Sequence, residues 1–191
     1  MSADAAHAWV HAYYNGLTKR LDKLADYAVN PNIALVSMFM CAKTDAEARA
    51  KAEGSTFFQF CLRFYGARSD RQRPAPREVN MWEEYERWKR ENAEAAEKAL
   101  SSGLIGSPET LRRKLRKFET SHIDQVILLN QAGRNTHQDI CDSLELFARE
   151  VMPEFHANIP AHEAWKAQVL GGSITLEEID TTAFGTRSLR G

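Results

Sequence analysis

Two nearly continuous apolar runs stand out in the pattern of hydrophobic and polar positions along the chain. They cover residues 33–40 and 123–129, contain β-branched side chains and are bounded by turn-forming residues. Runs of this length are typical of strands buried on both faces, which belong in parallel sheets. A third, shorter strand is predicted around residues 104–106. The pattern therefore predicts about three parallel strands.

Apolar residues at helical spacing occupy the segments around these runs. Ser107 followed by Pro108 is typical of an N-cap and a first helical position, and an apolar stripe follows them. Thr44 and Glu47 have the spacing of a capping box, which predicts one helix as far as about residue 65. Further helices are predicted over about residues 4–27, 78–100, 140–151 and 161–170. Strands alternating with helices predict an α/β fold.

The first predicted helix has an apolar face and two histidines. Ala8, Trp9 and Tyr13 share the face that we expect to be buried. His7 and His11 are four residues apart, and with Asp4 they could share a face as zinc ligands. A solvated helix face is the favoured interpretation, because no further His or Cys stands at ligand spacing. We therefore predict no metal site.

Composition and charge narrow the class of protein. The chain has 191 residues, enough for one sizeable core, and a formal net charge of −1, which gives no indication of nucleic-acid or membrane binding. Three scattered cysteines, Cys41, Cys61 and Cys141, are typical of reduced, buried thiols. The sequence shows neither a signal peptide nor a run long enough to span a bilayer. We expect a cytoplasmic protein.

Three phrases in this order carry a resemblance to a known family. They are GLIGSPETL at residues 103–111, DQVILLNQAG at 124–133 and SLELFAREVMPEF at 143–155, and TDAEAR at 44–49 extends the match. The sequence resembles the C-terminal end of the bacterial luciferase-like, flavin-dependent monooxygenases. The resemblance implies the C-terminal portion of a (β/α)8 TIM barrel, with a helical insertion at residues 78–100. A complete barrel needs about 250 residues, so the chain corresponds to its C-terminal half.

The resemblance also implies a function and a division of the chain. The family consists of FMN-dependent oxidoreductases, in which reduced FMN and O2 together oxygenate an aldehyde, a ketone or another small organic substrate. A separate flavin reductase is a possible partner. Residues 1–155 correspond to the partial monooxygenase domain, and residues 156–191 to a C-terminal helix and a loose tail.

Candidate site residues follow from the barrel interpretation, because barrel enzymes bind their ligands at the carboxyl ends of the strands. Ser107 follows one predicted strand, and Asn130 and Gln131 follow another. The neutral amide of Gln131 can hydrogen-bond a flavin edge or a substrate carbonyl, although it could equally be an ordinary loop residue. The hydroxyl of Ser107 is better explained as a helix cap. The resemblance supplies no catalytic residue, no phosphate site and no metal ligand.

Several other features have two interpretations. The aromatic stripe Trp82, Tyr85 and Trp88 could stack on a flavin or pack the insertion onto the barrel, and packing is favoured. The basic run at residues 112–117 could bind nucleic acid, but the wet face of a barrel helix explains it better. For Cys41 and Cys61, core packing is favoured over a reactive thiol.

Two functions from different classes remain. The chain is either one wall of an FMN-dependent monooxygenase or a non-catalytic half-barrel that pairs with another chain, because three parallel strands leave two unpaired edges. Either function implies a homo-oligomer or pairing with an N-terminal half.

Overall fold

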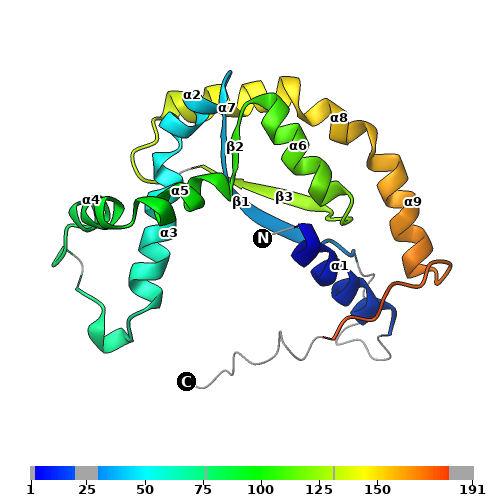
Figure 1. Cartoon of the computed structure of the whole chain (residues 1–191). Coiled ribbons are helices and arrows are strands. Elements are labelled where there is room, and N and C mark those ends of the chain that lie inside the picture. Colours follow the sequence, from blue (N-terminus) through cyan, green and yellow to red (C-terminus); the bar gives the residue numbers. More distant parts are fainter. Residues whose placement is uncertain (1–2, 20–29, 76, 131, 181–191) are drawn as a thin grey trace. The chain divides into compact units, whose positions relative to one another are not determined.

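The computed structural model describes residues 3–19, 30–75, 77–130 and 132–180 (Figure 1). Its strands are β1 (Ala34–Cys41), β2 (Leu104–Gly106) and β3 (Gln125–Leu129). Its helices are α1 (Ala3–Thr18), α2 (Asp45–Lys51), α3 (Glu53–Gly66), α4 (Met81–Glu91), α5 (Ala93–Ser101), α6 (Pro108–Glu119), α7 (His137–Glu150), α8 (Met152–Ala157) and α9 (Ile159–Leu170), with a 3-10 turn, η1 (Asp70–Gln72).

The three strands form one open parallel sheet in the order β2-β1-β3. β1 pairs in parallel with β2, so that Phe39 lies opposite Leu104 and Cys41 opposite Gly106. Figure 1 shows helices flanking these strands. The α/β class is thus confirmed, with three parallel strands and flanking helices as predicted. The described strands do not close into a barrel, so the barrel itself stays a prediction.

The prediction that residues 123–129 form a strand buried on both faces is wrong. Gln125 and Ile127 of β3 are exposed, and they alternate with partly buried residues. In β1, Val36 is 61% exposed. β3 is an edge strand of the described sheet, and successive side chains of a strand point to opposite faces. One face of β3 is therefore open in the part of the chain that the structure describes.

The sequence predicted where helices begin better than it predicted how long they are. The Thr44 hydroxyl caps α2 by accepting a hydrogen bond from the Glu47 N–H at 3.2 Å. The predicted helix to residue 65 is interrupted at Ala52, where the chain turns so that Gly54 can lie against another loop. The predicted helix over residues 78–100 is interrupted at Asn92, whose backbone and side-chain amides both donate to the Trp88 carbonyl. Each predicted helix is therefore a pair.

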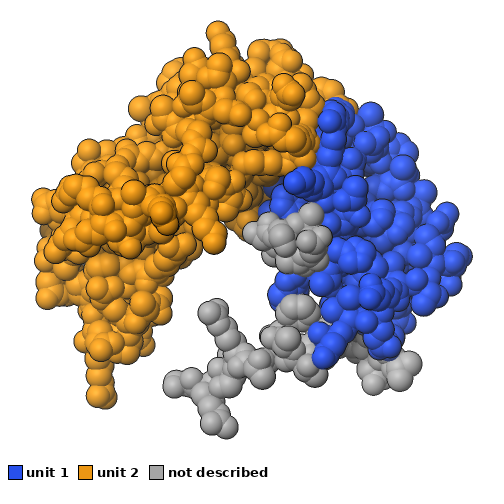
Figure 2. Space-filling view, viewed as in Figure 1, with its two compact units in different colours: residues 1–35, 115–126, 154–191 blue, residues 36–114, 127–153 orange. Residues whose placement is uncertain are grey.

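The chain forms two compact units, shown in two colours in Figure 2. Unit 1 comprises residues 1–35, 115–126 and 154–191, and unit 2 comprises residues 36–114 and 127–153. The core of unit 1 contains Val10, Tyr14 and Val169, and that of unit 2 contains Met40 and Ile105 with three alanines. The predicted division at residue 155 refers to family segments and stays a prediction.

The buried face of α1 is not the predicted one. Trp9 is 42% exposed, whereas Val10, His11 and Tyr14 are buried. The physical reason is that Tyr14 packs edge-on against Trp165 of α9, so the partner helix selects the face. The predicted helix reached residue 27, but α1 ends at Thr18 and residues 20–29 lie outside the described residues.

No described helix has both the length and the apolar character needed to cross a membrane.

Candidate functional site

The carboxyl edge of the sheet carries one group of polar residues, all within unit 2. β1 and β2 end in register, at Cys41 and Gly106. The carboxylate of Asp45 accepts hydrogen bonds from the Ser107 N–H at 2.6 Å and from the Thr110 hydroxyl at 2.9 Å. The hydrogen bond from the Ser107 backbone is the main cause that lowers the pKa of Asp45. An intramolecular carboxylate therefore occupies the N-terminus of α6, where an anionic ligand would otherwise bind.

Glycine at position 106 permits this arrangement. Its φ of +152° lies in a region that other residues rarely adopt. A Cβ at this position would lie 2.6 Å from Cγ2 of Thr110 and 2.9 Å from Oδ1 of Asp45. The Ser107 hydroxyl accepts a long hydrogen bond, 3.4 Å, from the Thr110 N–H, in agreement with its interpretation as a helix cap.

Asn130 follows β3 and has a buried polar atom without a partner. The residue is 6% exposed, and its side-chain nitrogen, Nδ2, makes no hydrogen bond to any described residue. Its carbonyl accepts from the Asn135 side chain at 2.9 Å, and Asn135 in turn accepts from the Gly54 N–H at 3.1 Å. The Asn135 side chain thus links Asn130 to Gly54 of α3, while the side-chain amide nitrogen of Asn130 has no partner in the described part of the chain. Gln131, the other predicted site residue here, lies outside the described residues.

The aromatic residues of the insertion pack onto α3, which favours the packing interpretation. Ring centroids of Trp82 and Phe57 are 5.0 Å apart, and those of Trp88 and Phe60 are 5.5 Å apart. The guanidinium of Arg134 lies 4.1 Å from the Trp82 ring centroid. The insertion therefore also contacts the loop that follows β3.

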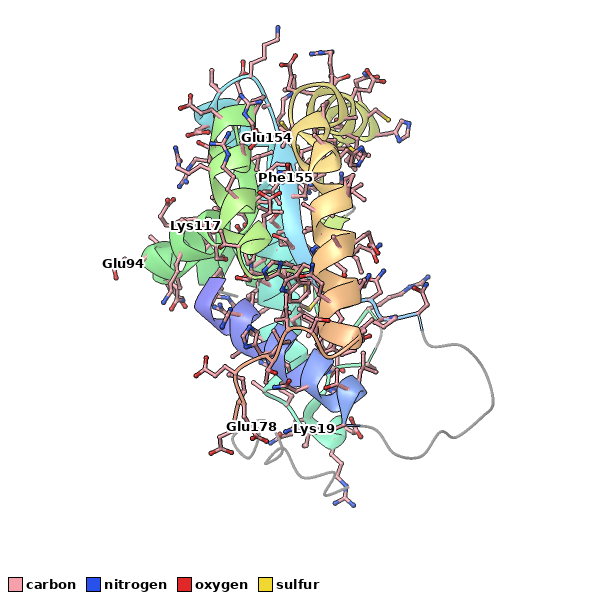
Figure 3. The ribbon with its side chains drawn as sticks, turned by 90° about the vertical axis from the view of Figure 1, so that its right-hand side faces the viewer. Lys19, Glu94, Lys117, Glu154, Phe155 and Glu178 are labelled. Carbon is pink, nitrogen blue, oxygen red and sulfur yellow. The ribbon has the colours of Figure 1, made fainter. Side chains whose placement is uncertain are left out.

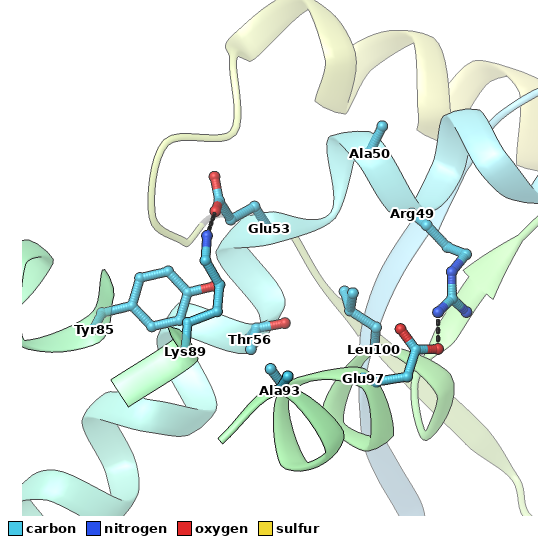
Figure 4. Close-up of a pocket in the computed structure, with 10 residues that line it drawn as sticks. Arg49, Ala50, Glu53, Thr56, Tyr85, Lys89, Ala93, Glu97 and Leu100 are labelled. Carbon is cyan, nitrogen blue, oxygen red and sulfur yellow. Dashed lines mark hydrogen bonds and ion pairs between the residues drawn. The ribbon is translucent and has the colours of Figure 1, made fainter. Parts of the chain in front are cut away.

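A cavity of about 370 Å³ lies within unit 2, lined by residues of α2, α3, α4 and α5 (Figure 4). Two ion pairs lie at its margin, one between Arg49 and Glu97 and one between Lys89 and Glu53. Tyr85 lies at the cavity, and burial raises the pKa of its hydroxyl to about 12. Sequence reasoning missed this cavity, since its charged residues resemble those of any wet helix face.

Asp124 is the centre of a buried polar network in unit 1 that the sequence did not indicate. Its side chain is 4% exposed. It accepts hydrogen bonds from the Tyr14 hydroxyl at 2.8 Å and from the Ile33 N–H at 2.8 Å, and it contacts His162 Nε2 at 2.8 Å and Lys166 Nζ at 3.0 Å. This network lies at the amino end of β3, away from the edge where barrel sites lie. We interpret it as structural.

His122 stacks on Trp165 beside this network, with ring centroids 3.9 Å apart and planes 3° from parallel. Its φ is +56°, a left-handed conformation that is uncommon for residues other than glycine. Burial lowers the pKa of His122, and the neighbouring His162 lowers it further. The imidazole is therefore held in its neutral form.

The remaining sequence candidates are mostly engaged in packing and capping. The Cys41 N–H donates to the Ser143 hydroxyl at 2.6 Å, and burial raises the pKa of the Cys41 thiol to about 11. A thiol with this pKa is protonated at neutral pH, which favours core packing. In the basic run, Lys114 donates to the carbonyl of Gly103 at 2.6 Å, and Arg116 pairs with Glu154. These partners disfavour a nucleic-acid surface.

His11 departs from the solvated-face interpretation. It is only 8% exposed, and Glu177, which follows α9, lies beside it and His7. The side chain of Asp4 lies outside what the structure describes.

No family model matches the chain, and no curated protein or solved structure is significantly similar to it.

Proposed function

We propose that the chain is the C-terminal part of a luciferase-like, FMN-dependent monooxygenase and supplies one wall of its active site. The three phrases that resemble this family include β2 with the start of α6, β3 with its following loop, and the end of α7. A parallel sheet with helices between successive strands supports the proposal, because a (β/α)8 barrel is built from such units.

The observation that carries the proposal is the buried Nδ2 of Asn130, which has no hydrogen-bond partner among the described residues. Buried polar groups of proteins are almost always paired, so an unpaired one calls for an explanation. Asn130 follows β3 at the edge where barrel enzymes bind ligands. The amide N–H group is suited to donate to a carbonyl oxygen of the flavin ring or of a substrate.

The fit of FMN to the described residues is partial. Asn130 provides a hydrogen-bond donor for the flavin ring. In the sequence, Ser107 directly follows β2, and Gln131 comes two residues after the end of β3. The N-terminus of α6 is filled by the carboxylate of Asp45, which repels a phosphate. The flavin phosphate must therefore be held by other residues, in agreement with pairing between this chain and an N-terminal half.

The cofactor, when bound in its reduced form, supplies the reaction of O2 with the organic substrate. This chain would orient the flavin through the buried side-chain amide of Asn130. A separate flavin reductase would supply the reduced cofactor.

The Asn130→Asp variant tests the flavin site. FMN in hundredfold excess over its dissociation constant should stabilise the wild-type chain by about 2.7 kcal/mol in a calorimetric melt. The substituted carboxylate offers an acceptor in place of the amide donor, so we expect FMN to leave the melting temperature of the variant unchanged. Formation of oxygenated product from a panel of aldehydes and ketones with photoreduced FMN, above the amount formed without protein, measures the activity.

Asn80→Asp is the matched control for the change of amide to carboxylate: aspartate keeps the cap of α4, although it loses the hydrogen bond that the Asn80 amide donates to Glu83 at 2.8 Å. Its FMN response should equal that of the wild type. A wild-type melt that is indifferent to FMN, or an equal response of the Asn130→Asp variant, contradicts the site.

A non-catalytic half-barrel that pairs with a second copy of the chain is the second candidate function. Val36 of β1 is 61% exposed and Ile127 of β3 is 45% exposed, although both belong to strands of the sheet. Apolar strand residues left open to water favour an association surface.

Sedimentation velocity tests this pairing. We expect the wild-type chain to be a dimer and the Val36→Glu, Ile127→Glu double variant to be a monomer, because like charges on an apolar surface oppose association. Leu62→Glu is the control, since Leu62 is 59% exposed on α3 and outside the sheet. A wild-type monomer at every concentration excludes the second candidate.

A further inference from the structure

We propose that His7, His11 and Glu177 form a binding site for a borderline divalent cation, of which Zn²⁺ is the one that the ligand types favour. One ligand atom of each residue lies within 4.8 Å of the other two. All three residues belong to unit 1. This site is independent of the flavin proposal.

Two elements far apart in sequence bring the ligands together. His7 and His11 are one helical turn apart on α1, so they share a face, and their ring centroids are 3.8 Å apart. The segment after α9 is attached to α1 and to the residue that follows it: the Asn15 side chain of α1 donates to the Glu177 carbonyl at 2.8 Å, and Lys19 pairs with Glu178 at 2.6 Å. Lys19 and Glu178 are labelled in Figure 3.

The burial of His11 is a second, independent observation. The residue is 8% exposed, and its Nδ1 atom is buried without a hydrogen-bond partner among the described residues. A histidine on a solvated helix face has water as a partner, whereas the buried Nδ1 of this ring has no hydrogen bond in its place. The backbone of Glu177 is a polar neighbour of the same ring. A coordinated cation accounts for such a ring, because it binds one ring nitrogen and fixes the proton on the other.

The donor set indicates the class of cation. Two imidazoles and one carboxylate suit Zn²⁺ and neighbouring transition metals better than Ca²⁺ or Mg²⁺, which prefer oxygen. Zn–N distances of about 2.0–2.1 Å place two ligands of one ion roughly 3.3 Å apart. Glu177 is exposed, so its carboxylate can rotate toward the two imidazoles. Three protein ligands leave one position for water.

Titration calorimetry with ZnCl2 on the full chain, without an affinity tag, tests the site. We expect one Zn²⁺ per chain. Loss of an outer-shell partner alone costs about 10–100-fold in metal affinity, so loss of a ligand should cost at least as much. Glu177→Gln and His7→Gln should therefore each weaken binding by tenfold or more. Both residues are more exposed than His11, so these variants test the site without removing a buried ring.

His156→Gln is the control, because His156 is an exposed histidine of α8 outside the cluster. It should bind Zn²⁺ as the wild type does. Replacement by Co²⁺ should give the visible absorption of a tetrahedral site in the wild type and not in His7→Gln. The proposal is overturned if the wild type binds no Zn²⁺, or if Glu177→Gln and His7→Gln bind it as tightly as His156→Gln.

Discussion

Asp124→Asn should lower the free energy of unfolding of unit 1 by about 3–5 kcal/mol, the usual cost of removing one partner from a buried ion pair. The Asp124 side chain is 4% exposed and that of Lys166 is 12% exposed. The variant leaves the ammonium group of Lys166 without its opposite charge. It also replaces one carboxylate oxygen by an amide N–H, so that either the Ile33 N–H or the Lys166 ammonium group faces a donor. A buried donor that faces another donor gains no hydrogen bond.

Amide hydrogen exchange measures the loss in free energy of unfolding separately for each compact unit. A separate measurement is needed because two compact units need not unfold together. We expect faster exchange in α1 and α9 and unchanged exchange in α3 and α4. Asp142→Asn is the control, since Asp142 is exposed on α7 and surface changes usually stay within about 0.5 kcal/mol. Equal protection in the two variants would show that the network does not stabilise unit 1.

At acid pH, the wild type and Asp124→Asn should differ less in their free energy of unfolding than they do at neutral pH. Burial alone would raise the pKa of Asp124, but hydrogen bonds from Ile33, His162, Lys166 and Tyr14 outweigh it, and the pKa is lowered. A carboxyl group with a lower pKa in the folded state stabilises the fold above its unfolded pKa of about 3.9. This contribution disappears as the pH falls through the folded pKa. Urea unfolding of both proteins from pH 7 to pH 3 measures it.

Gly54→Ala should destabilise unit 2 by about 3 kcal/mol, the upper end of the usual cost of overpacking. A Cβ at Gly54 would lie 1.9 Å from the Ala132 carbonyl oxygen and 2.7 Å from Oδ1 of Asn135. The Ala132 oxygen belongs to the backbone, so no side-chain rotation relieves the overlap. The chain must separate α3 from the loop after β3, and the hydrogen bond from the Gly54 N–H to Asn135 is lost.

Thermal and urea unfolding measure the effect of Gly54→Ala, and its FMN response reports on the loop that carries Asn130. Gly66→Ala is the control, because a Cβ there meets nothing within 4 Å at the end of α3. Removing this glycine should be neutral or stabilising by about 0.4–1 kcal/mol. A Gly54→Ala variant as stable as Gly66→Ala would contradict the close approach of the two segments.

Local features of the fold were predictable because they depend on neighbouring residues. The strand at residues 104–106 has the predicted bounds, and β1 lies within one residue of its predicted bounds. Thr44 and Ser107 precede helices because their hydroxyls can accept from amides two or three residues later. Helix interruptions were missed at Ala52, where the neighbouring loop and not the local sequence requires the chain to turn.

The candidate sites were predictable only in part. The position of Asn130 after β3 was predictable because sequence can locate the end of a parallel strand, and its role in a site stays a proposal. The Asp124 network was missed because its partners are as many as 110 residues apart in the sequence. Glu177 was missed for the same reason, since it is a single carboxylate with no ligand spacing to His7 and His11.

The sequence by itself determined the α/β class, the order of the three strands along the chain, and the helix caps at Thr44 and Ser107, because periodicity and capping act over a few residues. Only the tertiary structure decided which face of α1 is buried, because Tyr14 is buried by packing against Trp165 of α9, a contact that the helix pattern does not reveal. It also decided that β3 has an open face, and that His11 is buried beside Glu177. Burial depends on which distant segments meet, and that information is spread over the whole chain.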